Sequence, residues 1–131
     1  MKIRSARIIS ADIRRLVAFY ESITGLPAAW STDDFAEIAI QHFTLAIGST
    51  RTLQFFGEGL AEAASNKSVI IEFQVAAVDR EYEKIKDIVS DIVQQPVTMP
   101  WGNRSLLFRD PDGNLINFFT PVSPEAVRKF A

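Results

Sequence analysis

The stretch that decides the fold is Trp101-Gly102-Asn103-Arg104-Ser105-Leu106-Leu107-Phe108-Arg109-Asp110-Pro111-Asp112-Gly113-Asn114-Leu115-Ile116-Asn117-Phe118-Phe119. Two strand-like runs flank its central Asp-Pro-Asp-Gly. Asp110 can accept hydrogen bonds from backbone N–H groups, Pro111 presets the first turn dihedral, and Gly113 can take a positive φ. The tetrapeptide therefore predicts a type I turn closed by a bulge, which sets the register of a β-hairpin.

The N-terminal half has a pattern of one strand, one helix and three strands. Residues 3–10 are strand-like, Asp12 is a candidate N-cap, and Gly25 and Pro27 follow the predicted helix. The helix is indicated by an apolar stripe at helical spacing: Ile13, Leu16, Val17, Tyr20 and Ile23. Short extended runs are then predicted at 28–31, 35–40 and 43–47.

The C-terminal half repeats this plan. A strand is predicted at 69–75, and Asp79 is the candidate N-cap of a second helix. The helical stripe consists of Tyr82, Ile85, Ile88, Val89 and Ile92, with Pro96 as its breaker, and strands are predicted at 97–99, 104–108 and 114–120. Because Asp12 and Asp79 precede matching elements, the pattern indicates an internal duplication.

The duplication predicts an α+β fold made of two tandem βαβββ modules. We expect one domain over 1–131, with module one at 1–57, a linker at 58–67, module two at 68–122 and a short C-terminal helix at 123–131. One module cannot bury both faces of its sheet. The modules are therefore expected to form a curved mixed β-sheet around a central cleft, which is a usual place for a small ligand.

Composition limits the classes of function. The 131 residues include 14 Lys and Arg against 16 Asp and Glu, and no basic run suggests contact with nucleic acid phosphates. There is no Cys, so disulfides and thiolate metal sites are excluded. No apolar run is long enough for a membrane span. These features predict a cytoplasmic protein that binds neither nucleic acid nor membranes.

The chain resembles the vicinal oxygen chelate superfamily, which groups glyoxalase I, extradiol dioxygenases and bleomycin resistance proteins. The resemblance covers essentially the whole chain. It rests on Val17-Ala18-Phe19-Tyr20-Glu21-Ser22-Ile23-Thr24-Gly25-Leu26, on Glu72-Phe73-Gln74-Val75 with Val78-Asp79, and on Pro100-Trp101-Gly102 through Asp110-Pro111-Asp112-Gly113-Asn114-Leu115-Ile116. It implies the same fold of paired βαβββ modules that the duplication predicts.

The resemblance also implies where a divalent metal would be bound. Family enzymes use His, Gln or Glu from the first strand of each module and a Glu from the last strand. The matching positions are Ser5, Ile70 and Asn117, none of which is a good ligand for a cation. We therefore expect no metal and no cofactor. The alternative is a metal site with unusual ligands, for which the candidates are Gln54, Glu72, His42 and Asn117, with His42 also expected at an exposed turn between strands.

Aromatic side chains are the main candidates for ligand binding, since they offer large contact area at low entropic cost. The candidates are Trp101, Trp30, Phe56 and Phe108, together with Arg104, whose guanidinium could hold a carboxylate or form a salt bridge. The sequence thus predicts a metal-independent protein, expected as a homodimer, that binds and sequesters a hydrophobic or aromatic compound such as an antibiotic. The alternative is a glyoxalase-like lyase or a dioxygenase with a divalent metal.

Overall fold

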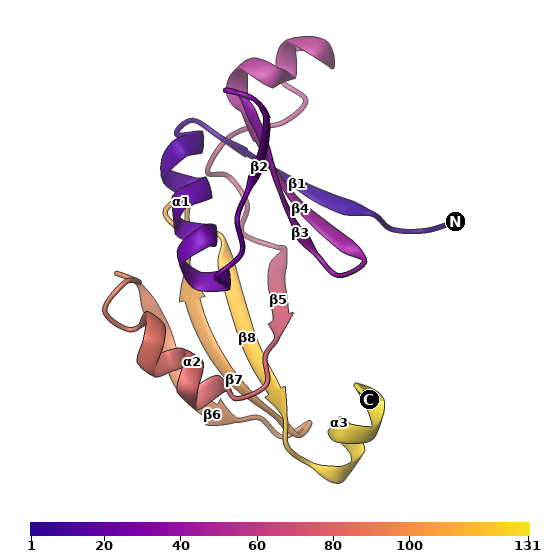
Figure 1. The fold of residues 1–131 in the computed structure, drawn as a ribbon, viewed down its shortest axis with the longest axis vertical. Coiled ribbons are helices and arrows are strands. Elements are labelled where there is room, and N and C mark those ends of the chain that lie inside the picture. Colours follow the sequence, from indigo (N-terminus) through magenta and orange to yellow (C-terminus); the bar gives the residue numbers. More distant parts are fainter. The chain divides into compact units, whose positions relative to one another are not determined.

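The computed structural model describes all 131 residues, which divide into two compact units, Met1–Asn66 and Lys67–Ala131 (Figure 1). The boundary lies within the predicted linker. Each unit contains one mixed sheet of four strands, which confirms the predicted α+β fold of two βαβββ modules. No helix combines the length and the hydrophobicity that crossing a membrane requires.

The first unit follows the predicted order of elements. These are β1 (Ser5–Ser10), α1 (Ile13–Thr24), β2 (Ala29–Thr32), β3 (Phe35–Ile40) and β4 (Phe43–Ser49), followed by the unpredicted 3₁₀ helix η1 (Thr50–Phe55). The sheet order is β1-β4-β3-β2, and β1 runs parallel to β4. The remaining neighbours are antiparallel, as expected for strands joined by short turns.

Local sequence signals explain both ends of α1. The Asp12 side chain accepts a hydrogen bond from the backbone N–H of Arg15, which satisfies one donor of the first turn. At the other end Gly25 takes the left-handed conformation, and its N–H donates to the carbonyl of Glu21. The predicted apolar stripe is buried in full and packs with Leu45 and Ile47 into the core.

The second unit contains β5 (Ile70–Gln74), α2 (Val78–Ile85), β6 (Ile92–Thr98), β7 (Asn103–Arg109), β8 (Leu115–Pro121) and α3 (Pro124–Lys129). Its sheet order, β5-β8-β7-β6, repeats that of the first unit, with β5 parallel to β8. The short terminal helix is confirmed, because the side chain of Ser123 accepts from the N–H of Ala126 and Pro124 opens the helix.

The prediction for α2 was wrong at both ends. The N-cap is Ala77, which makes no side-chain cap hydrogen bond, and Asp79 lies within the first turn. The helix ends at Ile85, so that Val89 is buried from the following turn and Ile92 begins β6. The apolar residues keep their helical spacing beyond the end of the helix, because Val89 in the turn and Ile92 in the strand also face the core. Tertiary pairing with β7 then decided the state of Ile92.

Pro96 lies inside a strand, whereas the sequence predicted a break there. β6 is the edge strand of its sheet, and its register with β7 shifts between Gln94 and Val97. Proline has no N–H to donate, so it is tolerated at such an edge or bulge.

The Asp-Pro-Asp-Gly hairpin is confirmed. The N–H of Gly113 donates to the carbonyl of Asp110 at 3.0 Å, and Gly113 has a φ of 86°. The Asp110 carboxylate accepts from the backbone N–H groups of Asp112 and Asn114, both at 2.9 Å. Arg109 donates to the carbonyl of Gly113 and closes the turn further. The turn sets the register in which Arg109 lies opposite Leu115.

Candidate functional site

The two faces of the second sheet differ in character. Strand alternation puts Leu106 and Phe108 on one face of β7, where both are fully buried and lie opposite Phe118 and Ile116 of β8. α2 covers this face, since its residue Asp79 pairs with Arg104, which shares the alternation of Leu106. Asn103, Ser105 and Leu107 project from the opposite face.

Glu72 and Asn117 are direct neighbours on that opposite face. They are cross-strand partners in the parallel pair of β5 and β8, and the side-chain amide of Asn117 donates to the Glu72 carboxylate at 2.8 Å. Ile70, which the resemblance placed at a ligand position, lies opposite Leu115 instead. The register therefore makes Glu72, and not Ile70, the residue beside Asn117.

Three buried oxygen atoms on this face have no hydrogen-bond partner. They are Oδ1 of Asn103, Oγ of Ser105 and Oδ1 of Asn117, in side chains that are 9%, 3% and 9% exposed. A buried oxygen without a partner costs about 1–3 kcal/mol, and native proteins contain few of them. Because they gather beside the exposed carboxylate of Glu72, this face of the sheet is rich in oxygen atoms that can accept hydrogen bonds. We call it the acceptor face.

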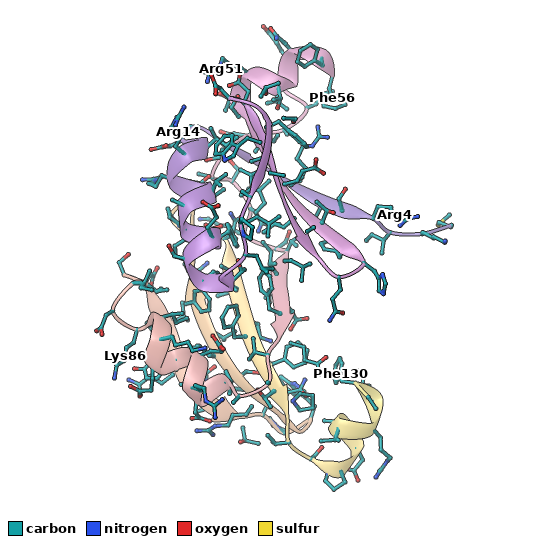
Figure 2. All side chains as sticks on the ribbon, viewed as in Figure 1. Arg4, Arg14, Arg51, Phe56, Lys86 and Phe130 are labelled. Carbon is teal, nitrogen blue, oxygen red and sulfur yellow. The ribbon has the colours of Figure 1, made fainter.

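The C-terminal helix borders the acceptor face. Phe130 follows directly after α3 (Figure 2). Its ring packs against Phe119, which lies opposite Ser105, with ring centroids 5.1 Å apart. Gly102 anchors the start of this segment, because its carbonyl accepts from the N–H groups of Val122 and Ser123. A Cβ on Gly102 would lie 2.0 Å from the hydroxyl of Ser123, so the contact requires glycine.

The first unit carries different chemistry at the matching positions. β1 and β5 each begin eight residues before their helix, so Arg7 matches Glu72, and its partner Ala46 matches Asn117. Arg7 is exposed and lies on the face opposite α1, like its neighbour Glu37 on β3. We call this the arginine face.

These residues do not fit the divalent metal that the resemblance implies. A guanidinium at position 7 repels a cation, and the methyl group of Ala46 cannot coordinate one. The second unit offers only the Glu72 carboxylate and the Asn117 amide oxygen. No group of three or more His, Cys, Asp or Glu side chains is arranged to hold a metal ion.

Arg104 forms the salt bridge that was one of its two predicted roles. Its Nε and Nη2 donate to the two oxygens of Asp79 at 2.7 and 2.9 Å, on the side of the sheet that α2 covers. This hydrogen-bonded guanidinium lowers the pKa of the Asp79 carboxyl. The pair attaches α2 to β7, and Arg104 is absent from the acceptor face.

The predicted aromatic residues are dispersed over the fold. Phe108 is fully buried and packs edge-on against Phe118, with centroids 5.0 Å apart. Trp101 is exposed in the loop before β7, and Trp30 is exposed on β2 opposite Ala36, on the side of α1. Phe56 is exposed after η1 and contacts Arg7. Their roles in ligand binding stay predictions, as does the cleft between the modules.

Among the metal-ligand candidates, the structure brings together only Glu72 and Asn117. His42 is exposed in the turn between β3 and β4, as predicted, and Gln54 is exposed in η1. The sequence reasoning missed Asn103, Ser105 and Arg7. The sequence did contain a signal for the first two. Asn103 and Ser105 are polar residues at alternate positions of a strand, and so they share the face that lies opposite the apolar one.

Comparison with known proteins supports the fold over nearly the whole chain. An uncharacterized protein of Bacillus subtilis, YraH, is 25% identical over 130 residues, covering 91% of this chain and 98% of that protein. A glyoxalase/bleomycin resistance protein/dioxygenase family enzyme from Burkholderia phytofirmans superposes with a TM-score of 0.83 at 14% identity, covering 93% of this chain and all of that one.

A glyoxalase/bleomycin resistance protein/dioxygenase from Nocardioides superposes with a TM-score of 0.78 at 20% identity, covering 95% of this chain and 85% of that one. The sequence model of the Glyoxalase/Bleomycin resistance protein/Dioxygenase superfamily matches residues 2–118. Both βαβββ modules fall within this match, apart from the end of β8. The chain therefore belongs to the glyoxalase/bleomycin resistance protein/dioxygenase superfamily.

Proposed function

We propose that this protein binds a small molecule without a metal ion and sequesters a hydrophobic or aromatic compound, as a bleomycin resistance protein would an antibiotic. The observation that carries the proposal is the acceptor face. Three buried oxygens without partners are a cost that a purely structural sheet would avoid. A ligand that supplies hydrogen-bond donors would offset that cost on binding.

The composition of the acceptor face indicates the chemistry of the ligand. Glu72 supplies a carboxylate, and Asn117, Ser105 and Asn103 supply neutral oxygens. These groups favour a ligand with N–H or O–H donors, and an ammonium group above all, because charge-assisted hydrogen bonds are the strongest. Leu107 lies on the same face, is partly exposed, and can contact an apolar or aromatic ligand body.

The alternative is a metal-dependent lyase or dioxygenase with unusual ligands. Its support is limited to Glu72 and Asn117, two neighbouring residues whose oxygens could coordinate a metal. A typical catalytic metal site has at least three protein ligands. Elemental analysis of the purified protein separates the two functions. One tightly bound divalent metal per chain would exclude the metal-independent function.

The direct test is an NMR titration of ¹⁵N-labelled protein with phenethylamine, an aromatic amine. Its ammonium is expected to bind at the Glu72 carboxylate, so the side-chain amide signals of Asn117 should shift in a saturable way. Glu72→Gln should weaken binding at least tenfold, since a hydrogen bond to a charged group contributes about 1.5–3 kcal/mol and about 1.4 kcal/mol corresponds to a factor of ten. Glu62→Gln, at an exposed site in the first unit, is the matched control and should bind as the native protein does.

A second variant separates a ligand site from ordinary sheet structure. Asn117→Leu removes the buried oxygen without a partner and also the hydrogen bond to the exposed Glu72 carboxylate. The first change offsets the second, so the free energy of unfolding should change little. The same substitution should weaken the binding of phenethylamine, because the ammonium loses one oxygen acceptor and keeps the Glu72 carboxylate. A variant that is less stable and binds the amine as the native protein does would contradict the role assigned to the acceptor face.

We also propose that the protein acts as a homodimer in the cytoplasm. The absence of Cys is compatible with a reducing compartment. Exposed apolar residues such as Phe55 and Leu60 provide surface that a second copy can cover. Light scattering at several concentrations would measure the oligomeric state, and a constant monomer mass would exclude the dimer.

A further inference from the structure

The arginine face contains a guanidinium with aromatic neighbours and no acidic partner. The Cζ of Arg7 lies 4.8 Å from the ring centroid of Phe35 and 5.4 Å from that of Phe56. Arg14, Arg51 and Arg104, in contrast, each pair with an aspartate. Arg7 therefore keeps its hydrogen-bond donors available, although two rings hold its side chain.

The backbone around Arg7 makes room for this arrangement. Phe35 of β3 lies opposite Gly48 of β4, and a Cβ at Gly48 would lie 3.7 Å from Cδ of Arg7. The aliphatic part of Arg7 therefore runs beside Gly48 on its way from β1 toward Phe35. An arginine stem lying along the sheet in this way loses less conformational freedom when its guanidinium binds a ligand.

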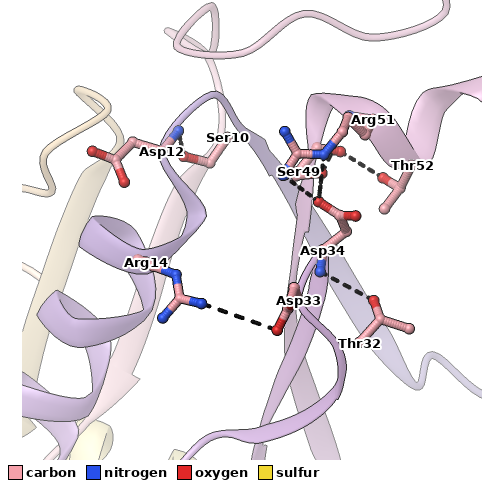
Figure 3. A network of polar contacts seen from close by, with 9 residues as sticks. All are labelled: Ser10, Asp12, Arg14, Thr32, Asp33, Asp34, Ser49, Arg51 and Thr52. Carbon is pink, nitrogen blue, oxygen red and sulfur yellow. Dashed lines mark hydrogen bonds and ion pairs between the residues drawn. The ribbon is translucent and has the colours of Figure 1, made fainter.

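A polar network positions the segment that carries Phe56. The Asp34 carboxylate accepts hydrogen bonds from Oγ of Ser49 and Nε of Arg51, each at 2.8 Å (Figure 3). The hydroxyl of Thr52 donates to the carbonyl of Ser49 at 2.7 Å. These bonds hold the start of η1 against the turn between β2 and β3, and Phe56 follows directly after η1.

We propose that Arg7, held between Phe35 and Phe56, is a binding site for the carboxylate of a small organic acid. The guanidinium offers parallel N–H donors whose spacing matches the two oxygens of a carboxylate. The exposed ring of Phe56 adds apolar contact area for the body of the acid. The site is made only of residues of the first unit and shares none with the acceptor face.

The surroundings of Arg7 are compatible with an anion. Glu37 lies on the same face, one strand beyond Ala46. The guanidinium of Arg7 lies over the rings of Phe35 and Phe56 instead of at the carboxylate of Glu37. Two strand spacings separate the backbones of Arg7 and Glu37 by about 10 Å. Ala46 between them is too small to cover the site.

The test is an NMR titration of ¹⁵N-labelled protein with benzoate, monitored at the Nε–Hε signal of Arg7 and the backbone signals of β1 and η1. Benzamide has the same ring without the charge, and inorganic phosphate tests for an anion that lacks a ring. Saturable shifts with benzoate, tenfold weaker binding of phosphate and none of benzamide are expected. Shifts of equal size with benzamide, or none with benzoate at tens of millimolar, would overturn the proposal.

Variants locate the effect at the guanidinium. Arg7→Gln should weaken benzoate binding at least tenfold, and Arg7→Lys, which keeps the charge without the planar fork, should weaken it less. Arg80→Gln makes the same change of charge at an exposed site on α2 and should leave benzoate binding unchanged. Benzoate binding that Arg7→Gln does not alter would also overturn the proposal.

The acceptor face provides the remaining comparison. Glu72→Gln should leave benzoate binding unchanged, and Arg7→Gln should leave phenethylamine binding unchanged. A negative benzoate titration would therefore exclude the carboxylate site alone, and a negative phenethylamine titration would exclude the proposed function alone. Because Arg7 is exposed, the Arg7→Gln variant is expected to fold, and its backbone spectrum would verify this in the same experiment.

Discussion

The two βαβββ modules share one architecture and have opposite chemistry on corresponding sheet faces. In the first unit Arg7 and Ala46 are cross-strand partners on this face, and in the second unit Glu72 and Asn117 are the matching pair. Arg7 on the arginine face contacts aromatic rings, whereas the acceptor face contains buried oxygens without hydrogen-bond partners. A duplicated backbone plan therefore preserves topology, while a few side chains on each sheet determine what each face can bind.

The modules also attach their helices differently. Asp12 caps α1 through its side chain, whereas α2 has no side-chain cap and is attached to β7 by Asp79 and Arg104. The aspartates that seemed equivalent in sequence thus have different roles. The difference shows that matching residues in a duplicated chain need not make matching contacts.

The largest expected effect is the loss of a core residue in either module. Phe108→Ala should cost about 3–5 kcal/mol and Leu16→Ala about 2–5 kcal/mol, because both side chains are fully buried and leave cavities. Urea denaturation measures both, with the exposed Val93→Ala as the control. A loss below about 1 kcal/mol at Leu16 would show that the first core contributes much less to the folded state than the second.

A smaller effect is expected at the helix caps. Asp12→Ala should lower the free energy of unfolding by about 1 kcal/mol, because the N–H of Arg15 loses its acceptor. Ala77→Ser is the converse change, since Ala77 has extended backbone and its helix lacks a side-chain cap. This variant should raise the melting temperature. If Asp12→Ala has no effect, the proposed asymmetry between the two helices is wrong.

The smallest effect is the pH dependence of the pair that anchors α2. Hydrogen bonding by Arg104 holds the pKa of the Asp79 carboxyl below its ordinary value of 3.8 in the folded protein. The pair therefore stabilises the fold at neutral pH, and its contribution is lost as the pH falls below 3.8 through the folded value. The stability difference between the native protein and Asp79→Asn should be small, since the pair is largely exposed, and should shrink in acid.

A matched variant tests the source of this pH dependence. Asp33→Asn makes the same change of charge at an exposed carboxylate whose pairing with Arg14 is longer, at 4.0 Å, and serves as the matched control. Thermal denaturation between neutral pH and pH 3 would measure both variants. A difference for Asp79→Asn that stays constant over this range would contradict the linkage.

Much of the fold could be predicted from sequence, because the decisive signals are local. The stripe from Ile13 to Ile23 and its Asp12 cap lie within one helix. Prediction failed at α2 and β6, where strand pairing across the sheet decided the state of Ile92 and the place of Pro96. The candidate site was predictable only in part: Glu72 and Asn117 were among the candidates, whereas Asn103, Ser105 and Arg7 were not.

Local sequence was sufficient for the Asp110 to Gly113 turn, the first helix and the duplicated order of elements, since these depend on dihedral preferences and on contacts a few residues apart. Long-range packing was needed to bring Glu72 beside Asn117, to turn Arg104 toward α2, and to bring Arg7 to Phe35 and Phe56. These contacts join strands and loops far apart in the chain. Their geometry depends on strand register, and a one-residue shift would turn each side chain to the other face.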